Sequence, residues 1–448
     1  MAAVEVLIIG AGMGGLTAAI TLARAGVLVT VIEARSQPGG LASGFVSNGI
    51  AFDAGPYMLW HPEELSWAFT QIGLPLRDHV MLYAIDDVCQ VSDAGGESVH
   101  FYRSLERTAA EIESQWTGAG SRYRSFVENI QSIHQDLTPI YSSARAHPLR
   151  LLTSGSSRHV PFLLKSFAKV IGEAKLPRPV VDGLGVWANM AGCGRAEAPA
   201  ALSFVPALLH APGCYYPLGG MSAIPKVLFA YALQSGVRFI FNTKIMRIIV
   251  KDTSVRAVVT AEGDVLESRF ILSDAAGLST YLLLADSGLS RRLRSRFNEV
   301  QLQSPGVVAY MSVKARSLSS YLRFHLSGGR SLCRLLVRPD AIMESSASSQ
   351  WQAARLIAPM LHHEAEQLGG SGQAEFLAHV LHEDWWRESL SEHRLLATRT
   401  PSGWAREFSL YRESVNPLVT GALMRHAEMA YRSPYIKGLY LTGSATQP

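Results

Sequence analysis

Three glycines near the start of the chain are spaced in a way that suits phosphate binding. They read Gly10-x-Gly12-x-x-Gly15, with Gly14 inside the same turn. The first glycine permits a tight turn, the second lets the backbone approach a pyrophosphate, and the third lets a helix and a strand pack closely. We therefore expect all four glycines to contact a dinucleotide, whose phosphates would meet free N–H groups at a helix N-terminus.

The flanking residues supply the elements that such a loop needs. Val4 to Ile9 and Val27 to Ile32 are apolar runs typical of strands, and Leu16 to Ala25 has a helical pattern. Glu33 ends the second run and is placed to accept hydrogen bonds from ribose hydroxyls. Its charge disfavours a 2′-phosphate, and hence NADP. The alternative is a glycine-rich turn without a ligand, which the flanking βαβ pattern disfavours.

A second glycine motif follows in "EARSQPGGLASGFVSNGIAFDAGPYML". It resembles that of the FAD-dependent oxidoreductases of the amine oxidase and carotenoid desaturase superfamily. The resemblance implies that Glu33 and Arg35 belong to the adenosine end of an FAD site. It also implies that the Gly39-Gly40 turn leads the diphosphate towards the flavin. Many members carry Arg after the two glycines, whereas Leu41 stands here, so a backbone N–H must replace that phosphate contact. The carotenoid isomerase branch also tolerates a non-Arg residue at this position.

The end of the same segment resembles the family strand that runs beneath the flavin, with Asp53 and Gly55 on the motif. The alternative is a plain turn that ends a strand. The sequence offers no catalytic base. Three side chains that follow this strand are candidates for lining the active site: Tyr57, Trp60 and His61.

Further matches lie in the middle of the chain. "YYPLGGM", Tyr215 to Met221, resembles the Y-P-x-G-G-M element of phytoene-desaturase-like enzymes. "VRFIFNTKIMRIIV" predicts two strands split at Asn242-Thr243, and in the family this region contacts the adenine through the backbone, here at Ile245. The turn Asp274-Ala275-Ala276 stands where the family usually has Asn-Ala-Asp, and we expect only packing and turn formation from it.

The chain ends in "GLYLTGSATQP", where Leu439-Tyr440-Leu441 is predicted to be a buried strand. In the resembling enzymes this strand runs into a glycine-rich turn and a helix that point at the flavin's pyrimidine end. Gly443 and Ser444 match the start of that element and are expected to contact the cofactor. From the missing remainder, the sequence predicts a truncated element, weakened FAD binding and little activity.

The resemblance covers most of the chain and predicts an α/β fold. It implies a Rossmann-like FAD-binding domain built from discontinuous segments, with an inserted α+β substrate domain. The expected FAD-binding segments are 1–80, 215–290 and 430–448. The expected substrate-domain segments are 81–214, with membrane-facing helices, and 291–429.

Residues 139–181 carry seven Lys or Arg and a single acid, Glu173. Within them, "VPFLLKSFAKVIGEAK" predicts an amphipathic helix with Lys165 and Lys169 off its apolar face. Such a helix suits a membrane surface. The alternative is an ordinary helix whose apolar stripe packs on the core. We expect membrane-surface association through this segment.

Composition narrows the classes of function. Of the 448 residues, 48% are hydrophobic and 17% are charged, which favours a large core or an oily binding surface, and the net charge of +4 does not indicate nucleic acid. Four scattered cysteines predict neither disulfides nor a zinc site. The histidine pairs His362-His363 and His379/His382 lack a third ligand at a recognised spacing, so no metal is expected.

No signal peptide or transmembrane helix is predicted, and a cytoplasmic location, peripheral on the inner face of a membrane, fits best.

These observations lead to one preferred function. The chain resembles FAD-dependent phytoene desaturases, which implies transfer of a hydride from a hydrophobic isoprenoid or carotenoid to flavin N5, with loss of a proton, to form C=C bonds. The alternatives are a carotenoid isomerase or retinol-saturase-like flavoenzyme, then an amine or protoporphyrinogen oxidase. A non-enzymatic prenyl-binding protein of the GDP-dissociation-inhibitor type is a further alternative. The oligomeric state is left open.

Overall fold

The computed structural model describes residues 5–141, 156–285, 288–315, 320–326, 332–338, 351–388, 390–418 and 429–443. Its helices are α1 (Met13–Arg24), α2 (Pro62–Gln71), α3 (Leu105–Gln115), α4 (Ala119–Tyr141), α6 (Val160–Leu163), α7 (Phe167–Glu173), α8 (Arg178–Met190), α9 (Phe204–Leu208), α10 (Ala223–Gln234), α11 (Gly277–Ser279), α12 (Arg291–Asn298), α13 (His362–His382) and α14 (Pro401–Phe408).

The strands are β1 (Glu5–Ile9), β2 (Leu28–Ile32), β3 (Gly44–Ser47), β4 (Ile50–Asp53), β5 (Leu59–Trp60), β6 (Leu82–Ala84), β7 (Asp87–Asp93), β8 (Ser98–Tyr102), β9 (Cys214–Pro217), β10 (Arg238–Ile240), β11 (Ile245–Lys251), β12 (Ser254–Thr260), β13 (Val265–Glu267), β14 (Phe270–Ser273), β15 (Gly306–Ala315), β16 (Leu322–Leu326), β17 (Cys333–Val337), β18 (Gln352–Pro359), β19 (Leu390–Arg399) and β20 (Leu439–Leu441).

A five-stranded parallel sheet in the order β10-β2-β1-β14-β20 brings together three distant parts of the chain. The central strand β1 is apolar because the sheet is covered on both faces: Leu7, Ile8 and Ile9 are all buried. Helix α1 contacts α10 beside this sheet. The predicted βαβ unit is confirmed, as is the division into two strands at residues 242–243.

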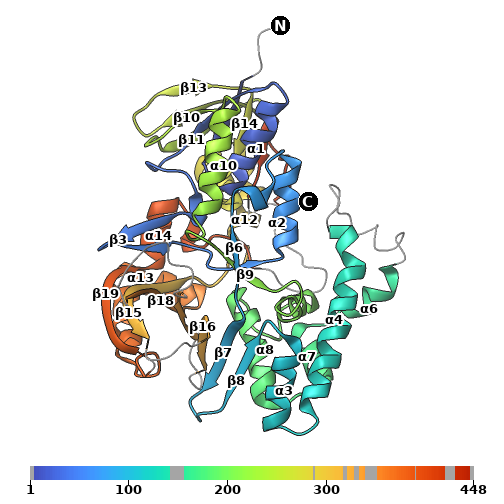
Figure 1. Cartoon of the computed structure of the whole chain (residues 1–448). Coiled ribbons are helices and arrows are strands. Elements are labelled where there is room, and N and C mark those ends of the chain that lie inside the picture. Colours follow the sequence, from blue (N-terminus) through green and yellow to red (C-terminus); the bar gives the residue numbers. More distant parts are fainter. Residues whose placement is uncertain are drawn as a thin grey trace.

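The chain also forms a seven-stranded sheet, in the order β19-β15-β18-β17-β16-β7-β8. Strands β7 and β8 come from the segment before residue 215, and the other five come from the segment after residue 305. In Figure 1 this sheet and helices α3, α4, α7 and α8 lie at the opposite end of the molecule from the parallel sheet. Helix α13 packs on β15, with Leu377 and Val380 buried in the contact.

The predicted amphipathic helix in the basic segment is wrong as a single helix. The chain forms a short turn, then α6, and then restarts at α7, where the Ser166 side chain accepts a hydrogen bond from the Lys169 N–H. Such a cap satisfies an orphan N–H group and fixes a new helix start. Phe167 and Ile171 are fully buried. The apolar stripe therefore packs on the core, as in the alternative of an ordinary helix. Residues 142–155 of this segment lie outside the described residues.

Within the part of the chain that the structure describes, no helix is long and apolar enough to cross a membrane. The same described residues hold no group of three or more His, Cys, Asp or Glu side chains placed to share a metal ion. All four cysteines are buried.

Candidate dinucleotide and substrate site

The glycine loop connects β1 to α1 and has the geometry that its sequence predicts. Gly10 has a φ of +98°, a conformation that glycine adopts without a steric penalty. A Cβ at Gly15 would lie 2.2 Å from the Gly10 carbonyl oxygen, so no larger residue fits where α1 packs on β1. The N–H of Gly10 donates to the Ile32 carbonyl at 2.8 Å, which fixes the loop to β2. The loop is therefore built for close approach of a ligand.

Glu33 follows β2 at the edge where the glycine loop lies. Its carboxylate accepts hydrogen bonds from the N–H groups of Ala11 at 2.7 Å and Arg35 at 3.0 Å. Only 7% of Glu33 is exposed, and it borders a cavity of about 130 Å³ that also includes Gly10, Gly12 and Ile245. The structure thus brings the predicted ribose-binding acid and the predicted adenine-binding residue to one cavity.

The second glycine turn closes over the same cavity. Gly39 and Gly40 both have positive φ, at 122° and 52°. The Arg35 guanidinium donates to the Ser43 hydroxyl at 2.9 Å and to the Gly40 carbonyl at 3.1 Å, so Arg35 holds the turn as well as facing the cavity. Arg35 also lies 3.7 Å from Glu33. The residues present fit a dinucleotide, because glycines of both turns and one acid border a single cavity.

Asp53 has a different environment from the one expected for a residue beneath a ligand. Its carboxylate accepts hydrogen bonds from the Tyr216 hydroxyl at 2.5 Å and the Met221 N–H at 2.8 Å. Burial raises its pKa, although these two donors and the positive charge of Arg355 oppose the rise. Asp53 therefore joins β4 to the "YYPLGGM" turn, and Gly220 leaves room for it, since a Cβ there would lie 2.9 Å from Asp53 Oδ1.

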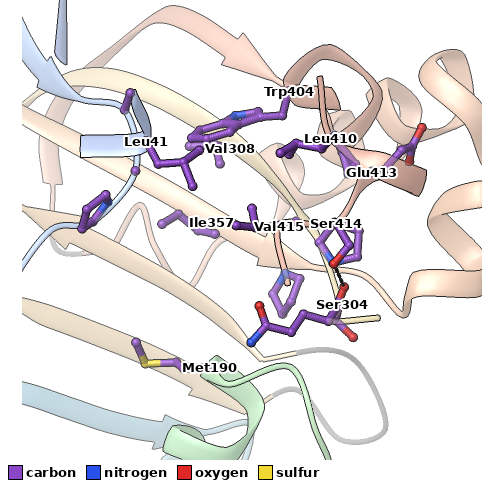
Figure 2. Close-up of a pocket in the computed structure, with 18 of the residues that line it drawn as sticks. Leu41, Met190, Ser304, Val308, Ile357, Trp404, Leu410, Glu413, Ser414 and Val415 are labelled. Atoms are coloured by element: carbon purple, nitrogen blue, oxygen red, sulfur yellow. Dashed lines mark hydrogen bonds between the residues drawn. The ribbon is translucent and has the colours of Figure 1, made fainter. Parts of the chain in front are cut away.

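A second cavity has a volume of about 310 Å³. Gly40 borders the first cavity, and the next residue, Leu41, borders the second. Figure 2 shows Leu41 and Trp404 at one end of it and Met190 and Ser304 at the other. Its apolar wall consists of Leu41, Ala54, Pro56, Tyr57, Met190, Val308, Ile357, Pro359, Trp404, Leu410 and Val415. Gly55 is also in the wall, where a Cβ would lie 2.3 Å from the Leu41 carbonyl oxygen.

The three candidates for lining the active site separate in the structure. Tyr57 borders the apolar cavity, and its hydroxyl donates to Met190 Sδ at 3.8 Å. Trp60 and His61 are not part of this wall: Trp60 packs edge-on against Trp187 at 5.1 Å, and His61 lies 5.1 Å from the His134 ring. The cavity therefore supports a lining role for Tyr57 and none for the other two.

Sequence reasoning missed several cavity residues. Arg334 and Arg355 border the apolar cavity, and the Arg355 guanidinium donates to the Gly55 carbonyl at 2.9 Å while stacking over Tyr57. Trp404 also reaches it, from α14. The two arginines lie on β17 and β18, and only the pairing of these strands in the seven-stranded sheet brings them beside residues 54–57. No local spacing could have indicated them.

The chain's last strand packs beside the glycine loop. A Cβ at Gly14 would lie 2.6 Å from the Gly443 N, and one at Gly443 would lie 2.6 Å from Asp274 Oδ1. Gly443 has a φ of +88°, as the predicted turn requires. Ser444 lies outside the described residues.

Comparison with known proteins finds sequence similarity over much of the chain. Residues 8–71 match the model of the NAD(P)-binding Rossmann-like domain. A 4,4′-diapolycopene oxygenase of Methylomonas sp is 25% identical over 85% of this chain and 76% of its own length. A zeta-carotene-forming phytoene desaturase of Myxococcus xanthus is 26% identical over 70% of this chain and 60% of its own length. The chain thus spans less than two thirds of that desaturase.

Solved structures agree on the fold. An oxidoreductase from Methanosarcina mazei matches with a TM-score of 0.68 at 14% identity, over 99% of this chain and 95% of its own. A redesigned putrescine oxidase matches with a TM-score of 0.62 at 14% identity, over 98% and 92%. The predicted fold class and resemblance are confirmed. The chain is similar in sequence to phytoene desaturases and a diapolycopene oxygenase, matches a Rossmann-like NAD(P)-binding domain over residues 8–71, and shares its fold with these solved oxidoreductases.

Proposed function

We propose that this protein is an FAD-dependent oxidoreductase of the phytoene desaturase type, which forms C=C bonds in a hydrophobic isoprenoid or carotenoid. The observation that carries the proposal is that consecutive residues border the two cavities, Gly40 the first and Leu41 the second. A dinucleotide with its adenosine end at Glu33 would reach the apolar cavity with its other end. Its reactive ring would then meet a substrate away from water.

The residues of the first cavity bind and orient the cofactor. Glu33 accepts from the ribose hydroxyls, and the N–H groups of the glycine loop bind the diphosphate. Ile245 borders the position of the adenine. FAD supplies the acceptor for a hydride, and the protein supplies orientation and exclusion of water. The domain boundaries predicted from the sequence assign these residues to the FAD-binding segments 1–80 and 215–290.

The residues of the second cavity select the substrate. Leu41, Ile357 and Trp404 present hydrocarbon to it, which suits a polyene and removes water from the reacting carbons. Loss of a hydride and of a proton from adjacent carbons leaves one new C=C bond. Tyr57 borders the same cavity as Leu41 and orients the polyene there.

Three alternatives use the same fold. A carotenoid isomerase or a saturase differs in the net redox change, and an amine or protoporphyrinogen oxidase differs in its substrate. A prenyl-binding protein of the GDP-dissociation-inhibitor type would carry lipid without a flavin. The hydrocarbon side chains of the second cavity favour a polyene, and the intact glycine loop with Glu33 disfavours a protein without a dinucleotide.

Membrane-surface association through 139–181 is a further part of the proposal, as is a location on the inner face of a membrane. Leu164 is 58% exposed between α6 and α7, and Lys169 is exposed beside it, so this turn offers an apolar tip with positive charge. Lys165 instead forms an ion pair of 2.6 Å with Glu173. Replacing Leu164 and Lys169 by Ser and Gln should lower co-sedimentation with anionic liposomes. Unchanged co-sedimentation would contradict this part.

Product analysis separates the alternatives. Protein loaded with FAD is incubated with phytoene in liposomes and, separately, with an aliphatic diamine, and the products are resolved by chromatography. A polyene with additional double bonds supports desaturation. A geometric isomer without loss of hydrogen supports the isomerase, and an aldehyde from the amine supports the amine oxidase. Protein that retains no FAD would favour the lipid carrier.

A further inference from the structure

The side chain of Asp274 lies directly against the glycine loop. A Cβ at Gly12 would lie 2.3 Å from Asp274 Oδ2, and a Cβ at Gly14 would lie 2.6 Å from Oδ1. Asp274 begins the turn after β14, and its N–H donates to the Ile9 carbonyl at 2.8 Å, at the end of β1. It also borders the cavity that holds Glu33. A carboxylate therefore occupies the side of the loop where an anion is expected to bind.

The N–H groups of the glycine loop interact with this carboxylate as they would with a bound anion. The N–H groups of Gly15 and Gly12 stabilise its ionised form, and these are groups that a diphosphate would use. Burial nevertheless raises the pKa of Asp274 to about 7, and the negative charge of Glu33 contributes to the rise. Proton uptake at neutral pH is therefore within reach of this side chain.

The charges around Asp274 do not neutralise it. Glu33, which follows β2, and Glu407 on α14 border the same cavity, as do the cations Arg35 and Lys244. Arg35 lies 3.7 Å from Glu33 and 3.8 Å from Glu407, so its charge is shared by those two acids. Within the described ranges, no ion pair joins Asp274 to a cation.

We propose, on the basis of the dinucleotide site above, that ionised Asp274 competes with the cofactor's diphosphate for the glycine loop, and that the cofactor binds to the form in which Asp274 carries a proton. The neutral carboxyl group donates its O–H to a phosphate oxygen, whereas the carboxylate repels that oxygen. Binding at alkaline pH then takes up one proton from solvent. An uncharged residue at this position would cause no such dependence, so Asp274 gives this chain a pH-dependent affinity.

The size of the effect follows from the fraction of protein that carries the proton. When only the protonated form binds, the apparent Kd rises by the inverse of that fraction. With a pKa of about 7, the Kd at pH 8.5 is roughly 30-fold weaker than the intrinsic value. At pH 6.0 the apparent Kd is only about 10% above the intrinsic value.

The test uses the full chain, its Asp274→Asn variant and, as a control for lost charge, Asp264→Asn, which lies exposed beside β13. The probes are FAD and ADP-ribose, because both carry a diphosphate diester whose charge is constant between pH 6.0 and 8.5. Isothermal titration calorimetry in buffers of different ionisation enthalpy gives both Kd and protons taken up.

We expect the wild type and Asp264→Asn to bind ADP-ribose roughly 30-fold more weakly at pH 8.5 than at pH 6.0, with uptake of one proton at pH 8.5. Asp274→Asn should change less than threefold and take up none. Equal affinity of wild type and Asp274→Asn for ADP-ribose at pH 8.5, absence of binding included, would overturn the inference. ADP-ribose binding with this pattern but without FAD binding would uphold the inference and contradict the proposed FAD-dependent function.

Discussion

The hydroxyl of Tyr216 donates a 2.5 Å hydrogen bond to the carboxylate of Asp53, and both groups are buried. The two residues are 163 positions apart in the chain, so this bond joins the β4 strand to the "YYPLGGM" turn across the interior. It gives a structural partner to Asp53, which the sequence predicts to be a cofactor-binding residue.

Tyr216→Phe should lower the free energy of unfolding by about 1–3 kcal/mol at pH 7, since it leaves a buried carboxylate with one donor fewer. The pKa of Asp53 would rise further, because the Tyr216 hydrogen bond is the largest influence that opposes burial. Urea denaturation measures the change. The control is Tyr83→Phe on the exposed strand β6. Equal stability of the two variants would show that the bond between Tyr216 and Asp53 contributes nothing.

Gly15→Ala should abolish FAD binding and lower stability, because the new methyl group would lie 2.2 Å from the Gly10 carbonyl oxygen. The matched control is Gly172→Ala in α7, where nothing lies within 4 Å and the helix gains up to about 1 kcal/mol. Flavin fluorescence quenching and thermal unfolding report on the two properties. A Gly15→Ala variant that binds FAD as tightly as the wild type would contradict the close packing of α1 on β1.

Trp404→Ala should lower kcat/KM for a polyene at least tenfold while changing FAD affinity less than twofold, since Trp404 borders the apolar cavity and not the dinucleotide cavity. Trp67→Ala is the control, because Trp67 is 59% exposed on α2. Initial rates over a range of substrate concentrations in liposomes, with a parallel FAD titration, give both numbers. An unchanged kcat/KM would show that Trp404 on α14 does not contribute to the substrate site.

The free energy of unfolding should decrease at acidic pH because His210 is buried in its neutral form. Burial lowers its pKa to about 4, and its Nε2 is 2.7 Å from the Tyr123 hydroxyl. Between pH 6.5 and 4 the unfolded chain binds a proton that the folded chain does not, so stability decreases as the pH falls through this range. The loss is about 1–3 kcal/mol.

Comparison of the wild type with His210→Gln separates this effect from the pH dependence that other titratable groups cause. Urea denaturation at pH 7.5 and 4.5 should give a smaller drop in the free energy of unfolding for the variant. An equal drop in both proteins would mean that His210 is protonated in the folded state over this range.

The sequence was sufficient for the parts of the fold that depend on local chemistry. The glycine loop, Glu33 and the strand at Leu439 follow from residue type and spacing, and the structure places them in one parallel sheet or at its edge. The substrate cavity could not be predicted in this way. Arg355 and Trp404 reach it only through the order of strands in the seven-stranded sheet, which long-range pairing determines.

The predicted amphipathic helix failed for a related reason. A 3.6-residue period is visible in residues 160–175, but Ser166 forms a stable cap that restarts the helix at Phe167. Asp274 was assigned only to turn formation, since its proximity to Gly12 depends on the parallel pairing of β14 with β1.

The central claim is that a flavin in this chain accepts hydride from a polyene. Anaerobic mixing of the FAD-loaded full chain with phytoene in liposomes tests it most directly, with flavin absorbance near 450 nm as the readout. The account predicts bleaching of the flavin together with a new absorbance at longer wavelength from the extended polyene. An oxidised flavin that stays unchanged in the presence of phytoene, in protein that binds FAD stoichiometrically, would contradict it.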